Sequence, residues 1–273
     1  MRSLFAALLA VATAIALAFL ILPVAAIFLR VPPGDLIGAL DHHVTRDALR
    51  VSLETSAIAH AAVLAIGTPA AYLLARRRFP GRGLVLTLVE LPLVLPPAVA
   101  GIALFAVFGR TGLLGGELDA LGVQIPFTQT AVVLAVAFVE SPFYLRGAIA
   151  AFEAVDGALI DAARTLGAGP ARVFARVALP LAVSGLGAAS ALALARGLGE
   201  FGATIIFAGS LQGVTQTLPL AIYAQFDQDF DTALAISALF IVIGALLLVT
   251  LKLYGWLRFG SIFRSRFAPS LSS

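Results

Sequence analysis

The sequence predicts an all-α, polytopic membrane protein with six transmembrane helices, on three grounds. Of the 273 residues, 60% are hydrophobic and only 12% are charged, whereas soluble proteins carry about 25% charged residues. The mean hydropathy is +1.03. Six apolar stretches each reach the roughly 20 residues that a helix needs to cross a bilayer. We therefore expect a single transmembrane domain over residues 1–273, with most of its surface facing lipid.

The predicted spans are the stretches in which apolar residues dominate. Glycine and proline are tolerated inside them because neighbouring helices can satisfy the freed backbone groups. Pro92, Pro96 and Pro97 are expected to kink the third span and so to help shape a cavity, the alternative being a plain bent helix. In chain order, the spans are expected at residues 4–29, 51–75, 84–109, 130–151, 179–208 and 232–257.

The first apolar stretch allows two interpretations. It begins Met1-Arg2 and contains Val24-Ala25-Ala26, a combination that also occurs in cleaved signal peptides. Its apolar run is longer than the roughly 7–15 residues typical of a signal peptide. This length favours a first helix that is retained.

The basic residues predict the orientation, because Lys and Arg are enriched in cytoplasmic loops. With the N-terminus inside, the inner side holds thirteen of the eighteen basic residues, so both termini are expected in the cytoplasm of a cell (inner) membrane protein. These residues are Arg2, Arg76, Arg77, Arg78, Arg82, Arg146, Arg164, Arg172, Arg176, Lys252, Arg258, Arg264 and Arg266.

The outer connections are acidic. Asp227, Asp229 and Asp231 lie before the last span, where they either meet basic residues of a docking protein or form a solvated loop.

Several function classes have no support in the sequence. The net charge of +3 comes mainly from basic clusters beside apolar runs, a pattern of membrane topology rather than of nucleic-acid binding. The chain has no cysteine, which excludes disulfides, thiolate metal sites and cysteine nucleophiles. Its three histidines form no His-Glu-x-x-His pair, so an intramembrane enzyme lacks a recognisable metal site.

ATP hydrolysis by this chain is also not expected. A phosphate-binding loop needs Gly-Lys-Ser/Thr, whereas Lys252 is the only lysine and lies between two leucines. No cofactor or metal is therefore expected on this chain.

The inner connection at residues 152–180 predicts two short helices. Gly167 is suited to end the first, and Pro170 to lie in the first turn of the second. Ala162 and Ala163 give the first helix a low profile that another backbone can approach closely. On the second helix one face carries Val173, Phe174 and Val177, and another carries Arg172 and Arg176. Amphipathicity alone leaves two interpretations, a loop lying on the bilayer or a docking elbow.

The spacing within this connection resembles the EAA motif of ABC importer permeases. That motif reads acidic-Ala-Ala, three residues, Gly, nine residues, Ile, one residue and Leu-Pro, and here Asp161 replaces the usual Glu and Val177 the usual Ile. The resemblance disfavours a passive channel or a proton-coupled carrier. It implies a type I ABC importer permease fold, a homodimer, and a coupling helix that docks on a separate ABC ATPase subunit, where ATP binds. The implied coupling residues are Asp161, Ala162, Ala163, Gly167, Leu179 and Pro180.

A second resemblance concerns the cargo. Residues 199–209 read Gly-Glu-Phe-Gly-Ala-Thr-Ile-Ile-Phe-Ala-Gly, and residues 215–223 read Thr-Gln-Thr-Leu-Pro-Leu-Ala-Ile-Tyr. Both blocks closely resemble molybdate/tungstate permeases, and this likeness extends from about Ser52 through the sixth span. It implies import of molybdate or tungstate delivered by an extracytoplasmic binding protein. The alternative is import of sulfate or thiosulfate, because those permeases share the Gly-Glu-Phe-Gly element.

A tetrahedral dianion is expected to bind neutral hydroxyl, amide and N–H donors. Each such side chain can instead bond across helices or cap a turn. The carboxylates Glu90, Glu140 and Glu200 would repel an oxyanion, and Glu200 is expected to pair with Arg196, four residues earlier. The candidate pathway donors are Thr204, Ser210, Thr215, Gln216 and Thr217.

Overall fold

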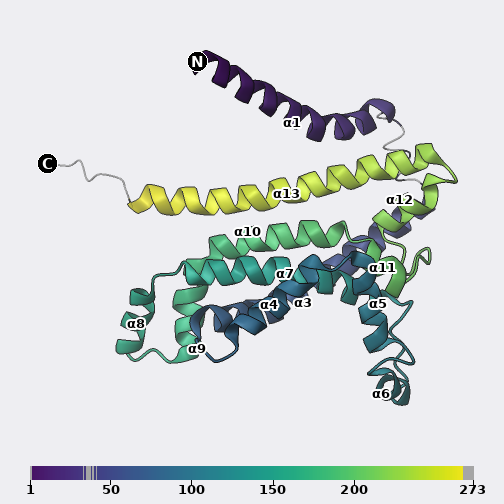
Figure 1. Cartoon of the computed structure of the whole chain (residues 1–273). Coiled ribbons are helices and arrows are strands. Elements are labelled where there is room, and N and C mark those ends of the chain that lie inside the picture. Colours follow the sequence, from purple (N-terminus) through teal and green to yellow (C-terminus); the bar gives the residue numbers. More distant parts are fainter. Residues whose placement is uncertain (1, 33, 35–37, 39, 41, 267–273) are drawn as a thin grey trace.

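The computed structural model describes residues 2–32, 34, 38, 40 and 42–266, and within these ranges the regular structure is helical, without strands. Long helices run beside one another, and the short helices α8 (Gly157–Thr165) and α9 (Pro170–Val173) lie together at one end of the bundle (Figure 1). The short helices α6 (Gly115–Ala120) and α12 (Leu218–Phe226) lie toward the other end. The predicted all-α fold is confirmed.

The centre of the bundle consists of α3 (His43–Arg76), α7 (Gln129–Glu153) and α10 (Leu179–Leu198). Both α3 and α10 pack extensively along α7. Small residues allow α7 and α10 to approach closely: a Cβ atom built on Gly147 would lie 2.6 Å from the Cβ of Ala189, and one built on Gly185 would lie 2.5 Å from that of Ala151. Glycine and alanine allow this approach in membrane helices because no side chain separates the backbones.

Two long helices flank this centre. α13 (Phe230–Arg266) packs against α10 and α12, and α1 (Arg2–Arg30) packs against α13. α1 lies at the edge of the molecule (Figure 1), and the window of residues that qualifies it as a membrane span is wholly unburied in this single chain. Its apolar surface is therefore available to lipid or to another protein.

Six crossings are compatible with the structure. Five helices among the described residues are long and apolar enough to cross a membrane, and α4 (Arg82–Val94) with α5 (Pro97–Phe108) provides a sixth if the pair counts as one crossing. The axes of α4 and α5 differ by 116°. Pro96 and Pro97 lack the N–H groups that a continuous helix needs, and Pro97 opens α5. The predicted kink in the third span is thus a complete break.

The fifth span differs from the predicted residues 179–208. The helix begins earlier, at Pro170, and continues through α9 and the π-helical turn η1 (Phe174–Ala178) into α10, which ends at Leu198. A separate helix, α11 (Gly202–Phe207), follows. Glycines near the break lower the helix propensity of this stretch, and the Glu200 carboxylate accepts a hydrogen bond from the N–H of Ala203 at 2.7 Å, which favours a new helix start. An apolar pattern alone cannot reveal this break.

The α7–α10 contact yields a prediction. Gly185→Leu should lower the free energy of unfolding by about 1–3 kcal/mol, because the larger side chain overpacks the contact with Ala151. Gly187→Leu is the matched control on the same helix, since no atom lies within 4 Å of a Cβ built there. Thermal unfolding of both variants in detergent is the measurement. Equal unfolding temperatures would show that the close approach does not stabilise the protein.

Candidate functional site

The segment at residues 156–178, which we call the elbow, connects α7 to α10 and has well-formed ends. The Asp156 carboxylate accepts a hydrogen bond from Ala158 N–H at 2.9 Å and caps the start of α8. At the other end of α8, Gly167 has φ +81°, with N–H donation from Gly167 to Arg164 O and from Ala168 to Ala163 O. This pair of bonds is the Schellman arrangement that glycine favours. The predictions that Gly167 ends the first short helix and that Pro170 lies in the first turn of the second are confirmed.

Contacts with the bundle hold the elbow in place. Tyr72 of α3 lies with its ring centroid 5.3 Å from Phe152 of α7 and 4.9 Å from Phe174 of η1. Arg76, at the end of α3, donates a hydrogen bond to the carbonyl of Val155 at 2.6 Å. Aromatic pairs in such edge-on and tilted geometries stabilise beyond their buried area. The elbow is therefore attached to α3 and α7 as well as to α10.

The elbow presents one side to the bundle and another to solvent. Ile160 and Val173 are buried, whereas Arg172 and Arg176 are exposed, as the amphipathic pattern predicts. Among the coupling residues taken from the EAA resemblance, Asp161, Ala162, Gly167 and Pro180 are exposed, and Leu179 is half-buried.

Ala163 differs from the expectation that both alanines form the low outer profile. It is half-buried and packs against the core cluster that contains Ile160. The two residues are three positions apart and thus share a helix face.

One exposed residue of the elbow was not singled out from the sequence. Leu166, immediately before Gly167, is 88% exposed, the highest fraction among the large apolar residues described. Its position at the C-cap of α8 turns it away from the helix face that packs on the bundle. The helical periodicity of apolar residues does not predict which way Leu166 points, because Leu166 lies at the residue where the helix ends.

Two helix breaks lie together beyond the end of α10. A Cβ built on Gly202 of α11 would lie 2.6 Å from the Cβ of Pro97, and one built on Gly101 of α5 would lie 2.8 Å from the carbonyl oxygen of Ala203. The start of α5 and the start of α11 therefore pack backbone against backbone. Irregular backbone at membrane depth occurs only where protein covers it or where it lines an aqueous cavity.

The ion pair expected from the four-residue spacing is present. Arg196 Nη1 lies 3.0 Å from Glu200 Oε2, and Glu200 is only 2% exposed. Glu200 therefore neutralises a neighbouring guanidinium and caps α11, two structural tasks that account for a carboxylate at this place.

The loop between α11 and α12 holds most of the candidate pathway donors. Thr215 Oγ1 accepts a hydrogen bond from Leu211 N–H at 2.9 Å, which closes the loop, and Gln216 Nε2 donates to Ser210 Oγ at 3.2 Å. The loop is fixed to α3, because Ser52 Oγ accepts the Leu218 N–H at 2.7 Å.

Thr204 and Thr217 differ from these side chains. Both are buried, and their hydroxyl groups have no hydrogen-bond partner among the described residues. Of the five candidates, these two are the ones whose hydroxyl groups neither donate nor accept a hydrogen bond among the described residues, whereas the hydroxyls of Thr215 and Ser210 each accept one.

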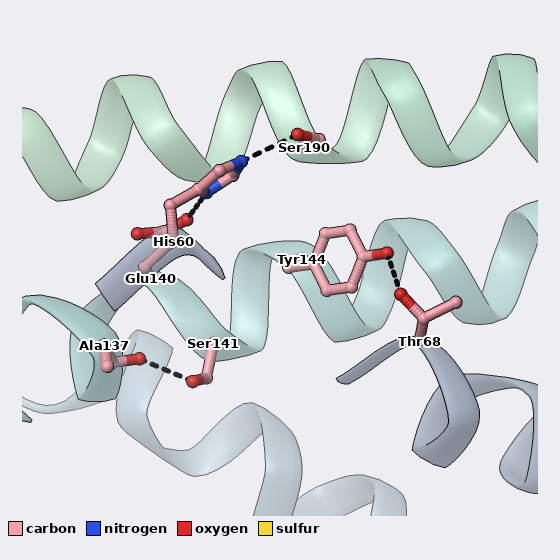
Figure 2. A network of polar contacts seen from close by, with 7 residues as sticks. All are labelled: His60, Thr68, Ala137, Glu140, Ser141, Tyr144 and Ser190. Carbon is pink, nitrogen blue, oxygen red and sulfur yellow. Dashed lines mark hydrogen bonds and ion pairs between the residues drawn. The ribbon is translucent and has the colours of Figure 1, made fainter. Parts of the chain in front are cut away.

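The remaining intramembrane carboxylates have basic neighbours. Glu90 Oε1 of α4 lies 3.7 Å from Arg146 Nε of α7 in an exposed ion pair. Glu140 of α7 is fully buried and contacts Nδ1 of His60 on α3 (Figure 2). The other ring nitrogen of His60, Nε2, lies 2.8 Å from Ser190 Oγ of α10. Sequence reasoning assigned no role to His60. The sequence feature that could have indicated this contact is that His60 and Glu140 are ionisable residues within apolar stretches.

The acidic turn before α13 lies at the end of the bundle opposite the elbow (Figure 1). Asp227, Asp229 and Asp231 are all exposed. Hydrogen bonds from the Thr232 hydroxyl and N–H lower the pKa of Asp229 below its usual value, so this carboxylate stays ionised at neutral pH. The turn thus carries negative charge on the surface farthest from the basic elbow.

Comparisons with known proteins agree with this architecture. A family model described as "binding-protein-dependent transport system inner membrane component" matches residues 67–258. The molybdenum transport system permease protein ModB of Mycobacterium tuberculosis is 43% identical over 231 residues, which cover 85% of this chain and 88% of the relative. The sulfate transport system permease protein CysW of Synechococcus elongatus is 36% identical over 208 residues, 76% of this chain and 72% of the relative.

A solved structure shares the fold. A chain of a bacterial alginate ABC transporter, in complex with an alginate pentasaccharide-bound periplasmic protein, matches with a TM-score of 0.71 at 17% identity. The match covers 92% of each chain. At this identity the likeness concerns the arrangement of helices and not the cargo.

The end of α8 yields a prediction. Gly167→Ala should lower the free energy of local unfolding of the elbow by about 1 kcal/mol, because a side chain disfavours the positive φ at this position. Gly169→Ala is the matched control, as Gly169 has φ −67° and no atom lies within 4 Å of its built Cβ. Hydrogen exchange of residues 157–169 should rise in the first variant only. The same exchange rate in both would contradict a conformational requirement for glycine at position 167.

Proposed function

Because the chain belongs to the family of inner-membrane components of binding-protein-dependent transport systems, we propose that it is the permease subunit of an ATP-driven importer for molybdate or tungstate. The observation that carries the cargo assignment is the block at residues 199–223, which forms the helix break after α10, α11 and the fixed loop beyond it. The higher identity to the molybdenum permease than to the sulfate permease supports the same choice.

In this proposal the elbow is the point at which a separate ATPase subunit acts. Its exposed side combines the acidic Asp161, the small Ala162 and the protruding Leu166, a surface that suits a shallow groove on another protein. An exposed leucine beside small residues can fill a pocket without steric obstruction. Anchoring through Phe174 and Arg76 allows the docked elbow to transmit movement.

The pathway is proposed to form between two copies of the chain. Pro96, Pro97 and Ala98 lie exposed at the break between α4 and α5, in the middle of a membrane crossing. Lipid cannot satisfy irregular backbone, so this surface requires protein or water beside it. A second copy that faces the breaks supplies both, because two such surfaces enclose an aqueous route between them.

Neutral groups near the breaks are suited to a dianion. Thr204 and Thr217 carry hydroxyl groups that are not engaged elsewhere in the described structure, and hydroxyl donors can hold an oxyanion without a countercharge. The nearby Glu200 is occupied by Arg196 and by the start of α11, which limits its repulsion of an anion.

The orientation follows from the charged ends of the bundle. The basic elbow is proposed to face the cytoplasm and the acidic turn at Asp227, Asp229 and Asp231 to face outward, with both termini inside. The outward end then receives the cargo from an extracytoplasmic binding protein, and the acidic turn is available to basic residues of that protein.

The cargo assignment predicts a competition result. In vesicles that contain the whole transporter, unlabelled tungstate should reduce uptake of labelled molybdate strongly, and the same concentration of sulfate should reduce it weakly. All three are tetrahedral dianions, but tungstate and molybdate are similar in size, whereas sulfate is smaller. Initial uptake rates at matched concentrations provide the measurement. Competition by sulfate as strong as that by tungstate would favour the sulfate alternative.

The docking role predicts a loss of coupling from one surface change. Leu166→Ser should weaken association with the ATPase subunit about tenfold, because a truncated interface anchor typically loses more than about 1 kcal/mol, while the permease remains inserted. Leu121→Ser is the control, since Leu121 is 76% exposed and lies outside the elbow. Co-purification of the ATPase subunit and ATP-dependent uptake should be measured together. Normal values of both for Leu166→Ser would reject this residue as an anchor.

The glycine at the end of α8 allows a second test of docking. Gly167→Pro should abolish ATPase coupling, because proline cannot adopt the positive φ of this position. A charged residue at Ala163 should have the same result by a different route, since it would disrupt the packing of α8 on the bundle. Membrane insertion, assayed by fractionation, should persist in both. Normal transport by either variant would contradict the proposed role of the elbow.

A further inference from the structure

A polar contact at the centre of the bundle takes no part in the proposed docking surface or cargo route. His60 of α3 lies between Glu140 of α7 and Ser190 of α10, so that three side chains join the three central helices (Figure 2). We call these three residues the polar clasp. His60 is 13% exposed and Glu140 is not exposed at all.

The clasp is a costly arrangement. Ionisable groups within a membrane are expensive unless they are paired, and they usually mark a functional position. One Glu140 oxygen contacts His60, whereas the other, Oε2, has no hydrogen-bond partner among the described atoms. A Cβ on Gly197 of α10 would lie 2.8 Å from this Oε2. The carboxylate is thus enclosed between two helices, where an apolar residue would cost less free energy to bury.

We propose that the polar clasp fixes the axial register of α3, α7 and α10. When the elbow moves, the three helices then move together as one rigid unit, and the helix breaks at their other end move with them. The inference rests on the proposed function, because it assigns the route by which the ATPase acts. α7 and α10 are the two helices that the elbow connects. Gly197, beside the carboxylate, is adjacent to Arg196, which pairs with Glu200 at the break.

Close packing alone cannot supply this register. The two closest points of the α7–α10 contact, Gly147 with Ala189 and Gly185 with Ala151, involve small residues that offer little resistance to sliding. Dispersion and apolar contacts are weakly directional, whereas a hydrogen bond weakens steeply when its geometry is lost. A single buried polar contact is known to set the register of packed helices in coiled coils. The clasp is suited to the same task here.

α3 has a second polar connection of the same kind. Thr68 Oγ1 lies 2.6 Å from the Tyr144 hydroxyl of α7 (Figure 2). A Cβ on the adjacent Gly67 would lie 2.9 Å from the Tyr144 ring. This contact fixes α3 to α7 near the elbow. Only the clasp includes α10 as well, which makes it the contact to test.

The decisive variant replaces both ionisable partners, His60→Leu with Glu140→Leu. Removal of one partner would strand a buried polar group, whereas replacement of both by apolar residues is often neutral for stability. We expect an unchanged unfolding temperature and a fall in molybdate transported per ATP hydrolysed of about threefold or more. The complete transporter in vesicles is the sample. The control variant, Glu90→Gln with Arg146→Gln, removes an exposed ion pair and should leave the ratio unchanged.

A distance measurement tests the register directly. The chain has no cysteine, so spin labels at Ile66→Cys of α3 and Leu192→Cys of α10, both exposed, are the only ones on each copy. Assembly with an excess of unlabelled chain leaves one labelled copy in each proposed homodimer, so that the distance measured lies within one chain. With the clasp intact, their distance distribution should stay narrow and unchanged on addition of ATP. In the paired Leu variant it should broaden. An unchanged distribution together with an unchanged transport ratio would overturn the proposal.

Two further outcomes are separable. If the wild-type transporter does not take up molybdate, the proposed cargo fails, while the distance measurement still tests the clasp because it needs no oxyanion. If the paired variant does not fold, Ser190→Ala serves instead, since it removes only the link to α10. A broadened distribution in that variant supports the clasp, and an unchanged distribution overturns it.

Discussion

The close approach of α7 and α10 is the constraint on which the remaining structure depends. Gly147 and Gly185 place two helix backbones side by side with no side chain between them. In lipid, apolar residues gain little from meeting each other rather than lipid tails, so tight van der Waals packing becomes the main source of association. Because the elbow joins these same two helices, its geometry is defined at both ends before any partner binds.

The helix breaks show the opposite use of the backbone. α4 and α5 separate at Pro96, and α10 and α11 separate at Glu200, and the new helices then pack against one another. The α4–α5 break frees polar backbone groups within a membrane crossing, if the pair counts as one crossing, and lipid cannot satisfy such groups. The α10–α11 break follows the end of the fifth crossing and packs beside the start of α5. Because the two breaks lie side by side, the backbone groups that no helix satisfies are concentrated in one region of the molecule. A region of this kind must be covered by protein or hydrated, and either condition suits a route for a polar cargo.

Local features of this fold could be predicted from the sequence, and contacts between distant residues could not. Gly167 and Pro170 were assigned correctly, because the end and the start of a helix are determined by a few neighbouring residues. The Arg196–Glu200 pair followed from its spacing for the same reason. The clasp of His60 with Glu140 joins residues eighty positions apart. No pattern within either span indicates which residue of another span it meets.

Two errors of sequence interpretation have the same physical origin. Hydropathy predicted a continuous span to residue 208, because the residues of α11 are as apolar as those of α10. Apolarity reports burial in lipid or protein and is silent about whether the backbone stays helical. Ala163 was placed on the outer profile because alanine fits either face. Its packing beside Ile160 depends on how α8 folds back on the bundle, which is a tertiary property.

α10 connects the two regions to which function is assigned. With 20 residues, it is about 30 Å long, close to the thickness of the hydrocarbon core. The elbow leads into its start, and the break that precedes α11 follows its end. In the proposed mechanism α10, held to α7 by close packing and by the polar clasp, moves as one rigid element, so that a shift at one end produces a defined shift at the other. The docking surface and the cargo region can then differ in chemistry, since only the rigid connection between them must be preserved.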